Sequence, residues 1–167
     1  DGGVLNAVNY DDSFGAALQA LGRHVDALSA YDAAIASQPG YAQAHNNRGV
    51  LLGLMGRHQD AVHSYDRAVQ IDAAYAQAHF NKGVALQAMG QSDAAVESYD
   101  AAIAANPAHA QAHNNRANVL QQTGRLDEAL QGYEQAIAHQ PGYAEAFYGM
   151  GMVLLSQKHM EAAALCL

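Results

Sequence analysis

A 34-residue repeat runs through almost the whole chain and constrains its fold more than any other feature. Histidine recurs at that spacing as His45, His79 and His113. The same spacing links a tyrosine, a leucine and a glycine of each unit: Tyr31, Tyr65, Tyr99 and Tyr133; Leu18, Leu52, Leu86, Leu120 and Leu154; Gly22, Gly56, Gly90 and Gly124. Self-similarity at a fixed period is the signature of a repeat architecture. We therefore interpret the chain as an array of similar units.

Composition predicts that each unit is helical. Half of the 167 residues are hydrophobic, alanine is abundant and there are only three prolines, a balance that favours helix and leaves no obvious strand. The repeated glycine interrupts one helical stripe and begins another, as the turn of a helical hairpin requires. In the second unit we expect helices over about 42–55 and 59–70. Proline follows the second helix of three units, at Pro39, Pro107 and Pro141, where it ends a helix without kinking it.

Small residues recur at three places in each unit and predict close contacts between helices. They are Gly49, Ala61 and Ala68, then Gly83, Ala95 and Ala102, then Ala117, Ala129 and Ala136. A single hairpin cannot bury such a face, so neighbouring hairpins must stack. The tyrosine at the same packing register is expected in the core. The predicted fold is all-α: a right-handed superhelical solenoid with a concave and a convex side.

This helix-turn-helix unit resembles the tetratricopeptide repeat (TPR), which has small residues, tyrosine and proline at these offsets. We place units at 8–41, 42–75, 76–109 and 110–143, with a partial unit at 144–167 and an N-terminal extension at 1–7. The large aromatic residue near the start of the family's first helix is replaced here by Asp11, His45, His79 and His113, and finally by Phe147. The C-terminal helical pattern ends without a stop signal, so we expect the chain to be a fragment or to continue.

The resemblance implies that the first helix of each unit lines the concave wall, and residues three and four apart share a helix face. On that face the chain is rich in carboxamides and nearly free of charge. The candidate peptide-binding residues are Gln43, Asn46, Asn47, Gln77, Phe80, Asn81, Gln87, Gln111, Asn114, Asn115, Asn118, Gln121, Gln122 and Tyr148. Asn47, Asn81 and Asn115 form a ladder, which is interrupted at Ser13 and Gly149.

A carboxamide donates and accepts hydrogen bonds at once, so a row of them suits the backbone of an extended peptide. We expect a protein-interaction scaffold that binds a protein or peptide partner. The row also resembles the TPR region of O-linked N-acetylglucosamine transferases, which implies the alternative of a substrate-recruiting region of a larger glycosyltransferase-like enzyme. A further alternative is a self-assembling scaffold whose ends stack on other copies, forming homo-oligomers through Leu154, Leu155 and Leu165. The simplest alternative is that these polar positions merely face water.

Other functions are disfavoured by the residues present. A net charge of −8 with eight Lys and Arg argues against nucleic acid, and no apolar run is long enough for membrane insertion. We expect no cofactor, no catalytic residue and no metal site. Stacked helices would hold His45, His79 and His113 about 8–10 Å apart, too far to share one ion, and His109 with His113 lacks a third ligand.

Arg48, Lys82 and Arg116 lie one position off the ladder, which disfavours an acidic C-terminal peptide as ligand. We expect a cytoplasmic protein. The chain does not begin with methionine, so an export leader removed before residue 1 stays open.

Overall fold

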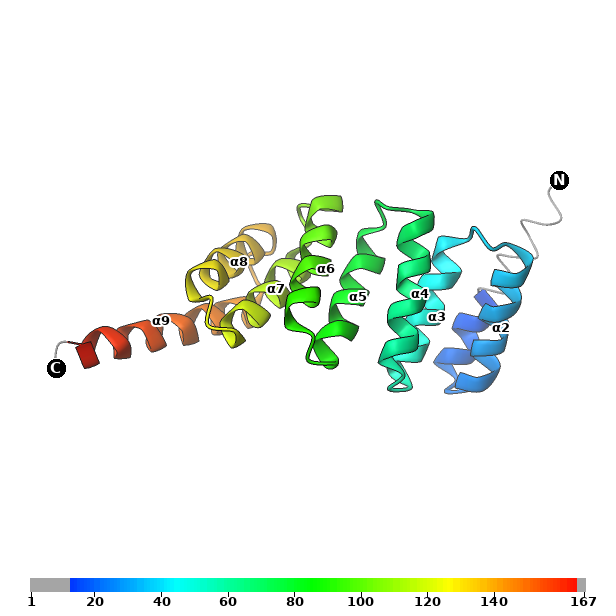
Figure 1. Cartoon of the computed structure of the whole chain (residues 1–167), viewed down its shortest axis with the longest axis horizontal. Coiled ribbons are helices and arrows are strands. Elements are labelled where there is room, and N and C mark those ends of the chain that lie inside the picture. The colour runs from blue at the N-terminus through cyan, green and yellow to red at the C-terminus, as the bar shows by residue number, and fades with distance from the viewer. Residues whose placement is uncertain (1–12, 165–167) are drawn as a thin grey trace.

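The computed structural model describes residues 13–164, and every helix in this part of the chain belongs to a repeating hairpin array (Figure 1). The predicted extension at 1–7, Asp11 and Leu165 lie outside the described residues. A helix over residues 13–20 is followed by α2 (His24–Ser37), α3 (Ala42–Leu54), α4 (His58–Ile71), α5 (Ala76–Ala88), α6 (Ser92–Ala105), α7 (Ala110–Gln122), α8 (Leu126–His139) and α9 (Ala144–Ala164). No strand occurs between residues 13 and 164. In the second unit, both ends of α4 and the C-terminal end of α3 differ from the expected bounds by one residue.

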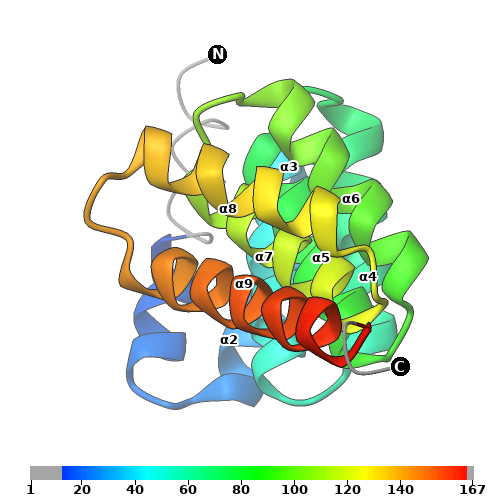
Figure 2. The same ribbon diagram turned by 90° about the vertical axis from the view of Figure 1, so that its left-hand side faces the viewer.

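The helices pack as antiparallel hairpins that stack along one axis. The tightest pairings are α3 with α4, α5 with α6 and α7 with α8, and each hairpin then contacts the next. Figure 2, a view from the C-terminal end, shows the hairpins lying one behind another with α9 across the near end. The all-α solenoid predicted from the repeat is confirmed. In the part of the chain that is described, no helix combines the length and apolarity needed to cross a bilayer.

The turn inside each hairpin depends on the repeated glycine. Gly22, Gly56, Gly90 and Gly124 all have φ between 72° and 79°, a left-handed conformation that costs glycine little and other residues more. The residue after each glycine donates its N–H to the carbonyl of the repeated leucine, as in Arg57 to Leu52 at 2.9 Å. This is the Schellman arrangement that ends a helix and reverses the chain. The leucine and glycine therefore recur together because they define one turn.

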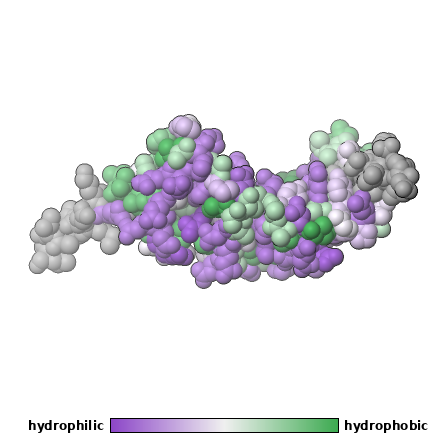
Figure 3. Space-filling view, turned by 90° about the horizontal axis from the view of Figure 1, so that it is seen from above, coloured by the Kyte–Doolittle hydropathy of each residue, from purple (hydrophilic) through white to green (hydrophobic). Residues whose placement is uncertain are grey.

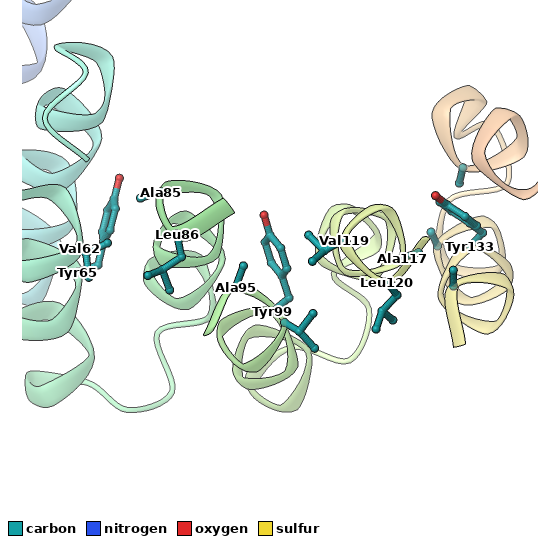
Figure 4. Packing of buried hydrophobic residues seen from close by; sticks show 14 of the residues in the cluster. Val62, Tyr65, Ala85, Leu86, Ala95, Tyr99, Ala117, Val119, Leu120 and Tyr133 are labelled. Atoms are coloured by element: carbon teal, nitrogen blue, oxygen red, sulfur yellow. The ribbon is translucent and has the colours of Figure 1, made fainter. Parts of the chain in front are cut away.

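The core follows the repeated tyrosine. Tyr31, Tyr65, Tyr99 and Tyr133 are all buried, as their register predicts, and they lie between successive helices with aliphatic neighbours (Figure 4). The small residue of the preceding helix is required by the tyrosine ring. A Cβ added to Gly49 would lie 2.6 Å from Cε1 of Tyr65, and one added to Gly83 would lie 2.6 Å from Cε1 of Tyr99. Glycine at this position therefore allows the two helices of a hairpin to approach across the ring.

We predict opposite effects for two glycine-to-alanine changes in α3. Gly53→Ala adds a Cβ with only ordinary contacts and should stabilise the fold by about 0.5–1 kcal/mol through helix propensity. Gly49→Ala gains the same propensity but forces the Tyr65 ring to move, so it should be less stable than Gly53→Ala by about 1–3 kcal/mol. Urea unfolding of both variants measures the difference. Equal stabilities would contradict the close packing of Tyr65 on Gly49.

Candidate functional site

The first helices of consecutive units line a series of recesses on one side of the solenoid. Between the helix at 13–20 and α3 there is a recess of about 330 Å³, and between α3 and α5 one of about 280 Å³. Between α7 and α9 a third measures about 570 Å³. The residues facing these recesses share one helix register: Asn47, Val50 and Leu54 on α3, Asn81, Val84 and Ala88 on α5, and Asn118, Gln121, Gly149 and Met152 on α7 and α9. We call this side the groove.

The predicted groove residues fall into three groups of different exposure. Gln43, Gln77, Gln111, Gln122 and Tyr148 are exposed; Asn47, Phe80, Asn81, Gln87, Asn115, Asn118 and Gln121 are partly buried; Asn46 and Asn114 are buried, with 5% and 3% of their surface exposed. The structure thus places Asn46 and Asn114 beneath the groove surface. The physical reason is that these two amides pack at the contact between successive first helices.

Two of the buried and half-buried asparagines bridge neighbouring units. Asn81 on α5 donates from Nδ2 to Oδ1 of Asn46 on α3 at 2.9 Å, and Asn46 in turn donates to Asn47 at 3.3 Å. Gln77 donates to Oδ1 of Asn81 at 3.0 Å. A primary amide has two donor hydrogens and two acceptor lone pairs. The ladder amides therefore stabilise the stack and keep capacity for further hydrogen bonds.

Asn114 is the equivalent of Asn46 in the fourth unit, but its partner is absent. Its Oδ1 is buried and, among the described residues, accepts no hydrogen bond. The residue that would donate to it, one unit after Asn115, is Gly149. A Cβ at Gly149 would lie 2.5 Å from Cε1 of Tyr133. Asparagine is therefore excluded there because the tyrosine ring occupies the space.

Ala117 stands where the second and third units have glycine. In those two units a Cβ added to the glycine would lie 2.6 Å from the tyrosine ring of the same hairpin, whereas the ring of Tyr133 lies 2.5 Å from a Cβ added to Gly149 on α9. Glycine at position 149 therefore admits the Tyr133 ring, and the amide ladder ends there.

Aliphatic residues on the same helix stripe as the candidate carboxamides form the floor of the groove. Leu54 is 64% exposed, and Val50, Val84 and Met152 also face the recesses. Val50 and Leu54 lie three and seven residues after Asn47, and Val84 lies three residues after Asn81, a spacing that puts them on one helix face. Figure 3 shows hydrophilic residues interleaved with small hydrophobic patches on the face that is in view. The groove therefore offers both amides and apolar contacts.

Phe80 replaces the buried asparagine in the third unit and packs rather than projecting into solvent. Its ring stacks on His109 at a centroid distance of 4.9 Å and lies 5.9 Å from Tyr99. His109 also caps α7, since its Nδ1 accepts a hydrogen bond from the Ala112 N–H at 3.3 Å. Phe80 therefore fixes the start of the next first helix from below the groove.

The repeated histidines anchor the loops between units. Nε2 of His45, His79 and His113 donates to the carbonyl six residues earlier, at Pro39, Ala73 and Pro107, over 2.9–3.1 Å. Burial lowers the pKa of His45 and of His113 below the ordinary histidine value, against the raising effect of the carbonyl. A neutral ring that carries its proton on Nε2 makes this hydrogen bond. No group of three potential metal ligands occurs among the described residues.

The repeated basic residues are used between units. Arg48 pairs with Asp32 at 2.7 Å, Lys82 with Asp66 at 2.6 Å, and Arg116 with Asp100 at 2.5 Å. Each pair joins the first helix of one unit to the second helix of the unit before it. The aspartates therefore neutralise the charges of these three basic residues, each of which directly follows an asparagine of the ladder in the sequence.

We predict that the two buried asparagines differ in their value to stability. Asn46→Ala loses the hydrogen bond from Asn81, so it should reduce the free energy of unfolding by about 0.5–1.5 kcal/mol more than Asn114→Ala does. Asn114→Ala removes a buried acceptor that has no donor to lose. Both variants lose the same contact to the following asparagine, so they control for one another. Matched chemical unfolding curves would show the difference, and equal losses would contradict the bridging role of Asn46.

Comparison with known proteins agrees with this geometry. A family profile described as "Tetratricopeptide repeat" matches residues 80–135, and one described as "TPR repeat" matches residues 54–90 and 117–158. Together the matches to the two profiles extend over residues 54–158. No curated protein matches the chain in sequence.

Several solved structures share the fold. The crystal structure of MamA is 25% identical with a TM-score of 0.81, over 86% of this chain and 84% of that one. YrrB, described as a TPR protein with an unusual peptide-binding site, is 22% identical with a TM-score of 0.75, over 89% and 76%. The first TPR of Spaghetti (RPAP3), bound to the HSP90 peptide SRMEEVD, is 19% identical with a TM-score of 0.68, over 70% and 93%. From its repeat, its fold and these matches, the chain belongs to the tetratricopeptide repeat family.

Proposed function

We propose that this chain is a protein-interaction scaffold that holds an extended polypeptide segment in the groove. The observation that carries the proposal is the row of carboxamides at Asn47, Asn81 and Asn115, which runs beside the aliphatic floor of the same helices. Amides pair with peptide N–H and C=O groups, and aliphatic recesses take side chains. Two structures of this fold, YrrB and Spaghetti, are described with a peptide-binding site or a bound peptide, which supports this function.

The charge of the groove favours a neutral ligand. The peptide bound to Spaghetti ends in acidic residues, whereas here Arg48, Lys82 and Arg116 already pair with aspartates. The chain carries a net charge of −8. An acidic segment would meet repulsion without a free cation on this row, so we expect the partner segment to be uncharged or basic.

The affinity of this arrangement is limited. Each neutral hydrogen bond contributes about 0.5–1.5 kcal/mol, and association costs about 4–15 kcal/mol. Three to six amides therefore give micromolar binding or weaker, on the order of the values that an isolated short peptide reaches. The aliphatic recesses, or a second tethered site, raise the affinity.

The glycosyltransferase-like alternative uses the same amide row to recruit substrate, and it rests on the resemblance of the row alone.

We predict that replacing Asn47, Asn81 and Asn115 together by alanine weakens peptide capture more than tenfold while the helix content stays the same. A peptide selected from a display library on the wild-type chain serves as the ligand, and titration calorimetry measures its affinity. The control is His63→Ala, Glu97→Ala and Gln131→Ala combined, three exposed positions of one register on the second helices. Unchanged affinity in the asparagine variant, with circular dichroism intact, would exclude the amide row as the binding site.

Exposed apolar residues on α9 favour a second candidate function, self-association. Tyr148 is 72% exposed, and Phe147, Leu154 and Leu155 are also exposed. No following hairpin among the described residues covers this helix, and an end repeat with an apolar outer face is a surface on which another unit can stack. The chain in that case assembles through its C-terminal unit.

We predict that a chain that self-associates in this way shows a mass that rises with concentration in light scattering, and that Leu154→Glu with Leu155→Glu removes the rise. The charges would be buried without partners in the assembled state. Val84→Glu, which places the same charge in the groove, should leave the rise unchanged. A monomeric mass over the whole concentration range would rule out assembly through α9.

A further inference from the structure

The hydroxyl of the core tyrosine is hydrogen-bonded by a glutamine in three units of the solenoid. Tyr31 donates to Oε1 of Gln19 at 3.3 Å, Tyr99 to Gln87 at 2.9 Å, and Tyr133 to Gln121 at 2.6 Å. In each case the glutamine lies twelve residues before the tyrosine. The glutamine therefore provides an acceptor for the hydroxyl at the polar end of the ring.

The second unit has the tyrosine but lacks the glutamine. Gly53 stands twelve residues before Tyr65, and the Tyr65 side chain has only 4% of its surface exposed. Its hydroxyl makes no hydrogen bond to any described residue, yet it is not among the buried atoms sealed without a partner, because it opens into the recess. A Cβ at Gly53 would lie 4.0 Å from the Tyr65 hydroxyl oxygen. The space of the missing side chain is therefore open.

This space is part of the recess of about 280 Å³ between α3 and α5, which Gly53 and Tyr65 both line. Most of its lining is aliphatic, and the polar side chains on its walls are those of His58, Tyr65 and Asn81. The recess is lined by Val50, Gly53, Leu54, His58, Tyr65, Asn81, Val84, Ala85 and Ala88. Burial raises the pKa of Tyr65 well above its ordinary range, so the hydroxyl keeps its proton and is a donor at neutral pH. Figure 4 shows the Tyr65 and Tyr99 hydroxyls pointing to the same side of the array.

We propose that this recess binds the glutamine side chain of a peptide held in the groove, with the carboxamide oxygen accepting the hydrogen bond from Tyr65. The proposal rests on the peptide-binding function above and specifies what the groove selects. The template lies within the chain, because three other units solve the same packing with an internal glutamine. The methylenes contact the aliphatic walls, and the carboxamide reaches the Tyr65 hydroxyl and the Asn81 amide.

Other side chains fit this recess less well than glutamine does. Methionine and leucine fill the apolar part but leave the Tyr65 hydroxyl without an acceptor. A donor that is buried without a partner carries an unfavourable desolvation free energy. Glutamate has the same length as glutamine but must lose its hydration in a mostly aliphatic recess, where His58 is the one basic residue of the lining. Asparagine is one methylene shorter than the glutamine that bonds the tyrosine hydroxyl in the three other units.

The first test measures selectivity with labelled alanine–serine peptides of nine residues that differ only at the central position, which is glutamine, methionine, glutamate or alanine. Fluorescence anisotropy with the full chain should give the tightest binding for glutamine. Its affinity should exceed that of methionine by about three- to tenfold, the range of one neutral hydrogen bond. Equal or tighter binding of methionine would overturn the proposal and indicate a plain apolar recess.

Filling the recess from within provides the matched variant. Gly53→Gln should remove the preference for a central glutamine, so that the glutamine and alanine peptides bind with equal affinity. Gly53→Met has a side chain of similar length without a carboxamide and should also close the recess to the peptide. A preference for glutamine that persists in Gly53→Gln would show that the selected side chain binds elsewhere, and would overturn the proposal.

A stability cycle tests the recess without any peptide and so separates this inference from the proposed function. The unfolding equilibrium constant of Gly53→Gln should be about three- to tenfold smaller than that of Gly53→Met, because the glutamine bonds the Tyr65 hydroxyl. Tyr65→Phe should abolish that difference. A positive cycle with no peptide binding to the wild-type chain would overturn the peptide function and retain the recess as a carboxamide site. A cycle with no coupling to Tyr65 would overturn the recess as well.

Discussion

The contact between each core tyrosine and the small residue of the preceding helix determines how the hairpins of this chain close. Glycine at positions 49 and 83 lets the ring lie directly against the helix backbone, so the two helices approach over an aromatic face rather than over stacked aliphatic chains. The ring is then fully buried while its hydroxyl is directed to the groove. The packing of the ring in the core thereby places a hydroxyl that needs a hydrogen-bond acceptor at the groove. Glutamine provides the acceptor in three units, and Gly53 provides none in the second unit.

Because successive units share these contacts, a single change in one unit propagates to the next. The ring of Tyr133 lies against Gly149, where a Cβ would be 2.5 Å from it. Because Gly149 has no side chain, Asn114 lacks the donor that Asn46 has, and its Oδ1 accepts no hydrogen bond from a described residue. The glycine at position 149 and the unpaired amide of Asn114 are thus linked through the packing of one ring. The groove changes character at this point, from an amide ladder to the exposed aromatic surface of α9.

The period of the repeat was enough to predict the helices, the glycine turns and the tyrosine core, because each depends on contacts within one unit or between equivalent positions. The asparagines were harder to place. Asn46 and Asn81 are 35 residues apart, so their bond joins two different registers, and a comparison of equivalent positions does not reveal it. The histidines and Phe80 were similarly ambiguous, since their partners are a loop carbonyl and the next unit's first residues. Which residues contact a ligand stays a prediction, and this holds for the aliphatic floor at Leu54 and Val84 as well as for the asparagines.

The ion pairs between Asp32 and Arg48, Asp66 and Lys82, and Asp100 and Arg116 have the same spacing and join the same two kinds of helix. The three joints between the first four units are thus built from one template, whereas at the joint between α8 and α9 Met150 stands where the basic residue would be. A duplicated unit inserted between two of these four would bring both the acidic and the basic residue with it and form two standard joints. The length of the array, and with it the length of the groove, is therefore a property that gene duplication changes without requiring a new interface.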